Sequence, residues 1–180
     1  MKRVVVTGIG LLTSIGSNYK ESWKNLLSGI SGIKSIDHFD TEDLPCKIAG
    51  YIENDSSKDY YYDPLTHLEK KDLNRNDRFI QYGIAAAKMA VEDAGITDIS
   101  DQDKLEVGVT IGSGIGGLET IYNGSITLVN KGARRISPFF ISSSLINLLS
   151  GQISIRYGFK GPNHSVVTAC ATGAHSIGDA

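Results

Sequence analysis

The sequence predicts an α/β fold with a layered sheet. Strand-like runs of β-branched residues alternate with helical patterns along the 180 residues. Hydrophobic residues make up 41% and charged residues 21%, which is ordinary for a folded domain and excludes disordered and collagen-like proteins. The 20 glycines against 4 prolines indicate tight turns and close backbone approaches. We find no internal repeat and no linker, so we expect one domain.

The first element is predicted to be a buried strand at residues 3–7, ending in a glycine turn. Basic residues followed by an apolar run also resemble a signal peptide. Thr7, Gly8 and Gly10 interrupt that run, and no small-residue cleavage site follows, which favours the strand. Nowhere does the chain reach the ~20 apolar residues that a membrane span needs. We therefore expect a soluble, cytoplasmic protein without a membrane partner.

The following elements are predicted from hydrophobic spacing and turn residues. A helix at 21–27, a strand at 47–52 and a polar loop at 54–63 precede the strongest signal, a helix from Asn76 to Ala94. Gly95 stands where the C-terminal cap of that helix belongs. The remaining predicted elements are a strand at 106–111, helices at 118–130 and 143–157, and a strand at 165–169.

Charge and cysteine content narrow the possible functions. A net charge of -2 excludes a generally basic nucleic-acid binder. No Asp or Glu occurs from Thr120 to Gly178. Such a stretch suits an anionic substrate or partner, and a buried segment would also lack acidic residues. Two cysteines are too few for a disulfide-stabilised secreted scaffold, so a reducing compartment is expected.

Cys170 is the candidate nucleophile. A short β-branched strand leads into it and a run of small residues follows, which is the pattern of a nucleophile elbow. At a helix N-terminus the helix dipole would favour the thiolate, and backbone N–H groups could stabilise an oxyanion. The alternative is a small buried hydrophobic residue. His164 and His175 are badly spaced to act as its base, Cys46 has no elbow pattern, and no metal-ligand spacing is present.

The segment from Gly112 to Gly117 fits the G-x-G-x-x-G pattern between a strand and a helix, the setting of a dinucleotide site. That fingerprint also needs an acidic residue about 20 positions later, and here that region has none. Close backbone packing or an acyl-lining loop therefore explains the glycines better than a cofactor does.

Six motifs in order make the whole chain resemble the β-ketoacyl-acyl-carrier-protein synthase II family of condensing enzymes. They lie at 4–10, 36–40, 79–84, 112–118, 136–140 and 168–170. The resemblance implies a thiolase-like fold, in which two similar halves stack as α-β-α-β-α layers in a homodimer. Residues 1–180 would be the N-terminal half. The chain ends inside a predicted helix, which also leads us to expect a longer protein.

The resemblance also implies an acyltransferase of fatty-acid synthesis. Cys170 would take an acyl chain from acyl-carrier protein as a thioester, and decarboxylation of malonyl-carrier protein would give the carbanion that attacks it. No cofactor or metal of its own is implied, because the phosphopantetheine arrives on the carrier protein. Ile115 would gate the acyl pocket, and Phe140 would line it across the dimer. The predicted docking residues for the acidic carrier protein are Lys70, Lys71, Arg75, Arg134 and Arg135.

The family's catalytic histidines, supporting lysine and second oxyanion donor belong to its C-terminal half. This agrees with the lack of a well-placed base near Cys170. The alternative is a truncated product that cannot run the condensation and at most acylates itself or dimerises.

Overall fold

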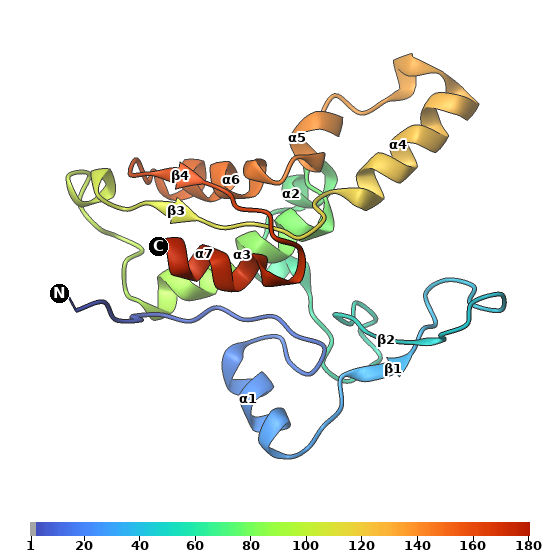
Figure 1. Cartoon of the computed structure of the whole chain (residues 1–180), viewed down its shortest axis with the longest axis horizontal. Helices are drawn as coiled ribbons and strands as arrows, with labels where there is room; N and C mark the ends of the chain where they lie inside the picture. The colour runs from blue at the N-terminus through green and yellow to red at the C-terminus, as the bar shows by residue number, and fades with distance from the viewer. Residues whose placement is uncertain (1–2) are drawn as a thin grey trace.

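Helices packed around a small pair of parallel strands form the centre of the molecule (Figure 1). The structure is a computed structural model that describes residues 3–180. Its α-helices are α1 (Tyr19–Leu27), α2 (Lys70–Arg75), α3 (Arg78–Asp93), α4 (Leu118–Lys131), α5 (Phe140–Ser144), α6 (Asn147–Tyr157) and α7 (Thr172–Asp179). The strands are β1 (Ile33–Ser35), β2 (Ile48–Gly50), β3 (Val109–Thr110) and β4 (Asn163–His164). Short 3-10 helices are η1 (Pro64–Thr66), η2 (Asp103–Leu105), η3 (Ala133–Arg135) and η4 (Ala169–Ala171).

The parallel pair β3–β4 joins two segments that are far apart in the sequence. Val109 lies opposite Asn163, and the Val109 N–H donates to the carbonyl of Pro162 at 2.8 Å. Helix α6 packs against both strands and against α3, and α7 packs against β3. A second sheet, in which β1 pairs antiparallel with β2, lies on the side of the molecule that carries α1 (Figure 1).

The hydrophobic core lies between α3, α6 and the β3–β4 pair. Its buried members are Leu68, Ile80, Ile84, Val91, Val109, Leu149, Ile153 and Phe159. Helix α3 confirms the predicted helix, because its apolar stripe faces this core. Gly95 has a φ of +68°, the left-handed conformation expected just beyond the end of a helix.

The predicted buried strand at 3–7 is wrong. This segment makes no ladder, and Val4 and Val6 are 87% and 81% exposed. A strand needs a neighbour to satisfy its backbone groups, and none lies beside these residues within the part of the chain that is described. The glycine turn that follows is packed instead. A Cβ at Gly8 or Gly10 would lie within 2.3 Å of a backbone oxygen of α3.

Other predicted elements are confirmed or corrected in their extent. Helices α1 and α4, strand β2 and the loop at 54–63 are confirmed, whereas only the β3 residues of 106–111 form a ladder. The predicted helix at 143–157 is interrupted at Leu145, which is extended with a ψ of 134°. Hydroxyls of Ser143 and Ser144 donate to the carbonyls of Phe139 and Phe140 and compete with the backbone there.

The predicted strand at 165–169 is also wrong, because the ladder consists of Asn163 and His164 and ends before it. The Ile111 carbonyl, just beyond β3, accepts a hydrogen bond from the Ser165 hydroxyl at 2.5 Å and not from the Ser165 backbone. From there the chain turns away towards α7.

Candidate functional site

Cys170 lies on a sharp turn between the strand pair and α7. Ala169 has a φ of +50°, a backbone conformation that a residue with a side chain seldom adopts. Cys170 follows in η4, two residues before α7 begins, and it is exposed. Thr172 fixes the turn, because its hydroxyl accepts from the Thr168 N–H at 2.9 Å and donates to the Ala169 carbonyl at 2.8 Å. The turn and the helix that follow are the ones the sequence predicts, whereas the strand predicted to lead directly into Cys170 is absent, because the ladder ends at His164.

Two histidines lie near this turn but are bonded elsewhere. His175 Nδ1 is 3.3 Å from the Thr168 hydroxyl, and its Nε2 is 3.5 Å from the Asp179 carboxylate. His164 Nε2 is 4.0 Å from the same carboxylate. Within residues 3–180, no hydrogen bond joins a histidine to Cys170.

The glycine-rich loop at 112–117 packs directly on the turn that carries Cys170. A Cβ at Gly112 would lie 2.1 Å from the Val166 carbonyl oxygen, and one at Gly114 would lie 2.9 Å from the Ala169 carbonyl oxygen. The Gly117 N–H is already bonded to the Ser144 carbonyl. These contacts use the glycines for close packing, as expected.

The two candidate acyl-pocket residues lie on different sides of α4. Ile115 precedes the helix, is 72% exposed and lines a hollow of about 660 Å³ with Leu118 and Tyr122. Phe140 begins α5, and its ring meets the position of Gly124 on α4. Both side chains therefore lie next to residues of helix α4, Ile115 near its start and Phe140 beside Gly124.

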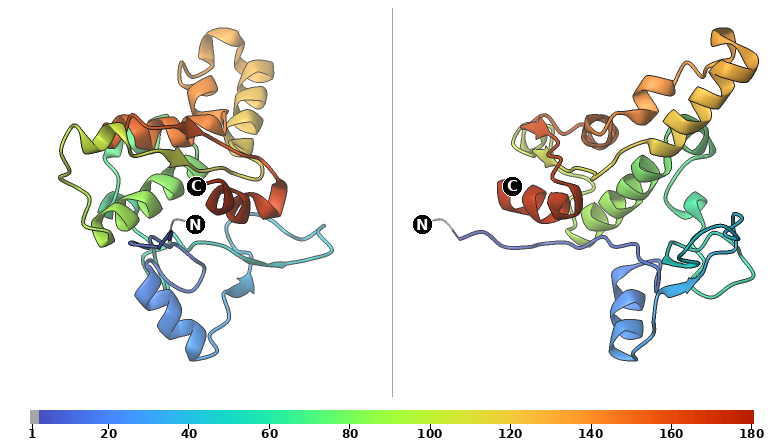
Figure 2. Two further views of the ribbon diagram at one scale, coloured as in Figure 1. Left: turned by 60° about the vertical axis from the view of Figure 1, so that its left-hand side comes forward. Right: turned by 45° about the vertical axis from the view of Figure 1, so that its right-hand side comes forward.

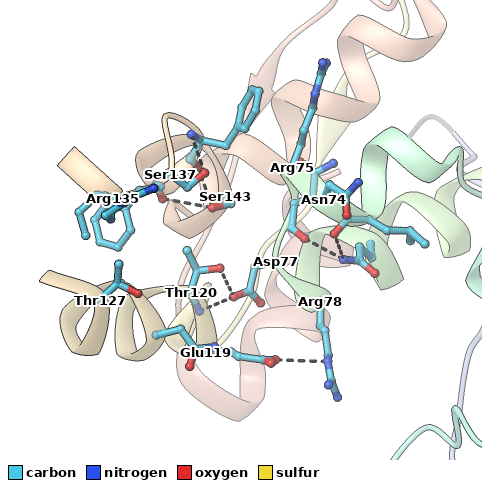
Figure 3. Close-up of a pocket in the computed structure, with 18 residues that line it drawn as sticks. Asn74, Arg75, Asp77, Arg78, Glu119, Thr120, Thr127, Arg135, Ser137 and Ser143 are labelled. Carbon is cyan, nitrogen blue, oxygen red and sulfur yellow. Dashed lines mark hydrogen bonds and ion pairs between the residues drawn. The ribbon is translucent and has the colours of Figure 1, made fainter. Parts of the chain in front are cut away.

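Three of the candidate docking or pocket residues line one hollow of about 450 Å³, namely Arg75, Arg135 and Phe140 (Figure 3). The Arg75 guanidinium also lies 5.0 Å from the centre of the Phe139 ring. Lys71 lines a neighbouring hollow of about 420 Å³ with Arg75. Lys70 and Arg134 are exposed and line neither of these two hollows. Of the predicted docking residues, Arg75 and Arg135 thus share one hollow, whereas Lys70 and Arg134 do not line it.

Asp77 is a residue of this region that sequence reasoning missed. It is only 8% exposed, and it accepts hydrogen bonds from both the backbone and the hydroxyl of Thr120, 43 residues later in the chain. Its position directly before α3 was a signal of an N-cap, but nothing local in the sequence pointed to Thr120.

Neither a metal-binding cluster nor a membrane-spanning helix is found within residues 3–180. These residues hold no cluster of three or more His, Cys, Asp or Glu side chains suited to a metal ion. None of their helices combines the length and the apolar character of a membrane span.

Comparison with known proteins identifies the family. The model of the β-ketoacyl synthase N-terminal domain matches residues 1–180. This chain belongs to the β-ketoacyl synthase family. Among curated members, the chain is 51% identical over 180 residues to the 3-oxoacyl-[acyl-carrier-protein] synthase 2 of Rhizobium meliloti (strain 1021). It is 45% identical over 179 residues to the synthase 2 of Vibrio cholerae.

The chain spans about two fifths of the length of these β-ketoacyl synthases, 43% of the first and 41% of the second, while 100% and 99% of the chain are covered. Its fold matches solved members of the family. The ishigamide ketosynthase/chain length factor has a TM-score of 0.75 and 26% identity, over 97% of this chain and 44% of that one. A β-ketoacyl synthase from Burkholderia phymatum STM815 has a TM-score of 0.75 and 24% identity, over 100% and 43%. The chain thus has the thiolase-like fold of the N-terminal half of a ketosynthase.

Proposed function

We propose that this chain supplies the nucleophile-bearing half of a 3-oxoacyl-acyl-carrier-protein synthase 2, an acyltransferase of cytoplasmic fatty-acid synthesis. One observation carries the proposal. An exposed cysteine lies on the turn between β4 and α7, in a chain that is 51% identical to such a synthase over its whole length.

The proposed reaction has two steps. In the first, the Cys170 thiolate attacks the carbonyl carbon of an acyl thioester on acyl-carrier protein, and the phosphopantetheine thiol leaves. In the second, malonyl-carrier protein loses CO2, and the resulting carbanion forms a carbon–carbon bond to the acyl carbonyl and expels the Cys170 thiolate. Holding the acyl chain on the enzyme divides a difficult condensation into two easier reactions. The Cys170 N–H would supply half of the oxyanion hole.

The groups that move protons would come from the C-terminal half that the longer relatives possess. His164 and His175 support this assignment, because their hydrogen bonds and ion pairs go to Thr168 and Asp179. Residues 1–180 would then be one half of the catalytic domain. By themselves they would not catalyse the condensation, and at most they would acylate themselves or dimerise. Turnover by the purified 180-residue chain would contradict this.

Acylation of Cys170 tests the proposal most directly. The protein at its full natural length is incubated with acyl-carrier protein bearing an acyl chain, and its intact mass is measured. We expect one acyl group on the unsubstituted protein, one on Cys46→Ala, whose exposed thiol has no proposed role, and none on Cys170→Ala. Labelling of Cys170→Ala would refute the assignment of the nucleophile.

The acidic carrier protein would dock on the basic side chains Lys70, Lys71, Arg75, Arg134 and Arg135. Arg75 and Arg135 line one hollow, and residues 120–180 carry five basic and one acidic side chain, which suits an anionic partner. A related structure contains a type II PKS acyl-carrier protein in complex with its ketosynthase.

Replacing both Arg75 and Arg135 with Glu should weaken binding of the carrier protein about tenfold at low salt and less at high salt. Lys20→Glu, a charge reversal on helix α1, should leave the binding unchanged.

We also propose that the protein is a homodimer. Among the described strands β4 pairs only with β3. Residues 165–167 after it make no ladder, and Val167 is 54% exposed, whereas the Thr168 N–H is already bonded to Thr172. An extended segment with unpaired backbone groups can pair with its copy across a twofold axis. Sedimentation velocity of the full-length protein tests this, and a monomer would contradict it.

A further inference from the structure

Helix α4 lacks an N-cap of its own. Gly117 occupies the capping position and offers no side chain, although the first N–H groups of a helix have no acceptor within the helix. Asp77 supplies an acceptor from elsewhere in the chain. Its Oδ2 accepts from the Thr120 N–H at 2.9 Å and from the Thr120 hydroxyl at 2.7 Å (Figure 3).

The same carboxylate caps a second helix. Asp77 is the N-cap of α3, where its Oδ1 accepts from the Phe79 N–H at 3.4 Å. One carboxylate, 8% exposed, therefore joins the N-termini of α3 and α4, and the positive ends of both helix dipoles favour its charge. Removing it would leave part-buried N–H and O–H groups without this acceptor, which costs more than the loss of an exposed hydrogen bond.

Asp77 holds the N-terminus of α4, which adjoins the candidate acyl-pocket residue Ile115. Ile115 lies two residues before the capping position of α4, and Asp77 and Ile115 line the same hollow of about 660 Å³. On the next turn of α4, a Cβ at Gly124 would lie 2.5 Å from the Phe140 ring. The position of α4 therefore sets where Ile115 lies relative to Phe140.

The other side of the glycine-rich loop is held independently of Asp77. Gly112 and Gly114 pack against the backbone of Val166 and Ala169, in the segment that leads into Cys170. A change at Asp77 would accordingly move the wall of the pocket at Ile115 while the turn at Cys170 stays where it is.

We propose that Asp77 is a positioning residue that fixes the N-terminus of α4, and with it Ile115, and so determines which acyl chain lengths reach Cys170. The inference rests on the proposed function, since it concerns the acyl chain that Cys170 would accept. A short chain would end before the displaced wall, whereas a long chain would meet it. The effect of an Asp77 substitution must therefore depend on chain length.

Acylation of Cys170 across a series of carrier-bound acyl chains, from short to long, tests the inference in the protein at its full natural length. Asp77→Ala should change the ratio of long-chain to short-chain acylation rates by about tenfold. Asp77→Asn keeps one acceptor and should change it less. The matched control is Asn18→Ala, which removes an N-cap that serves only its own helix, α1, and should leave the ratio unchanged.

Hydrogen exchange of the peptide that contains residues 117–121 provides a second measurement that needs no activity. Its exchange should be about tenfold faster in Asp77→Ala and unchanged in Asn18→Ala. Unchanged exchange, or faster exchange with an unchanged chain-length ratio, would overturn the inference. An equal loss of acylation at every chain length would also overturn it. If the unsubstituted protein accepts no acyl chain at all, the proposed function fails, and the inference falls with it.

Discussion

Replacing Gly112 with Ala probes the contact between the glycine-rich loop and the turn at Cys170. The new Cβ would lie 2.1 Å from the Val166 carbonyl oxygen and 2.6 Å from Cγ2 of Thr172. Ordinary contacts begin at 3.4 Å, so one of the two segments must move by about 1.3 Å. Thr172 is 3% exposed, and its rotamer is held by the bonds of its hydroxyl to the Thr168 N–H and the Ala169 carbonyl. Overpacking of this kind typically costs about 1–3 kcal/mol of unfolding free energy.

The functional effect should exceed the effect on stability. Val166 and Thr172 lie before and after Cys170 in the chain, so a displacement of either segment should move this proposed nucleophile. A shift of about 1 Å in a reacting group can slow a reaction about a hundredfold. We therefore expect acylation of Cys170 to slow by about that factor while the protein remains folded. Urea denaturation measures the free energy of unfolding, and intact mass measured over time gives the acylation rate.

Gly173→Ala is the matched control. It introduces the same methyl group three residues after Cys170, in α7, where no atom lies within 4 Å of the new Cβ. An alanine there should be neutral or stabilise the helix by up to about 1 kcal/mol. Equal acylation rates for Gly112→Ala and Gly173→Ala would refute the idea that the loop positions the nucleophile.

Two further predictions concern stability. Asp72, 6% exposed, accepts from the Arg156 guanidinium at 2.9 Å, so Asp72→Asn should lower the free energy of unfolding by about 1–3 kcal/mol in urea. Asp101→Asn, which breaks an exposed ion pair, should change it far less, and equal effects would contradict this reasoning. Burial raises the pKa of Tyr62 from 10.0 to about 12. The unfolded chain loses this phenol proton first, so stability should fall as pH rises from 10 to 12. Tyr62→Phe should lessen that fall, and an unchanged pH profile would argue against it.

The elements that were predicted correctly are those whose signals lie within one stretch of sequence. Helix α3 was predictable because its apolar stripe and Gly95 lie within one stretch of sequence. The strand at 3–7 was not, because a strand depends on a neighbour that the pattern of one segment cannot reveal. The interruption of the predicted helix at Leu145 depends on serine hydroxyls competing for carbonyls, which a hydrophobic period does not record.

The same distinction applies to the site. The turn at Cys170 and the close approach of Gly112 and Gly114 follow from small residues clustered in the sequence. The link from Asp77 to Thr120 does not, because these residues come together only when α3 and α4 pack. Sequence reasoning therefore predicted the turn at Cys170, the proposed nucleophile, and missed the Asp77 carboxylate that caps the adjoining helix α4.

The parallel pairing of β3 with β4 also governs how the chain folds. Ser165 and Ile111, which meet at the end of this pair, are 54 residues apart in the sequence, and α4, α5 and α6 lie between them. Contacts over such separations close large loops and slow folding. At about 5–20 residues per second, a ribosome needs several seconds to add the second strand after the first. During that time the apolar face of α3 lacks Leu149 and Ile153 of α6, which cover it in the folded protein.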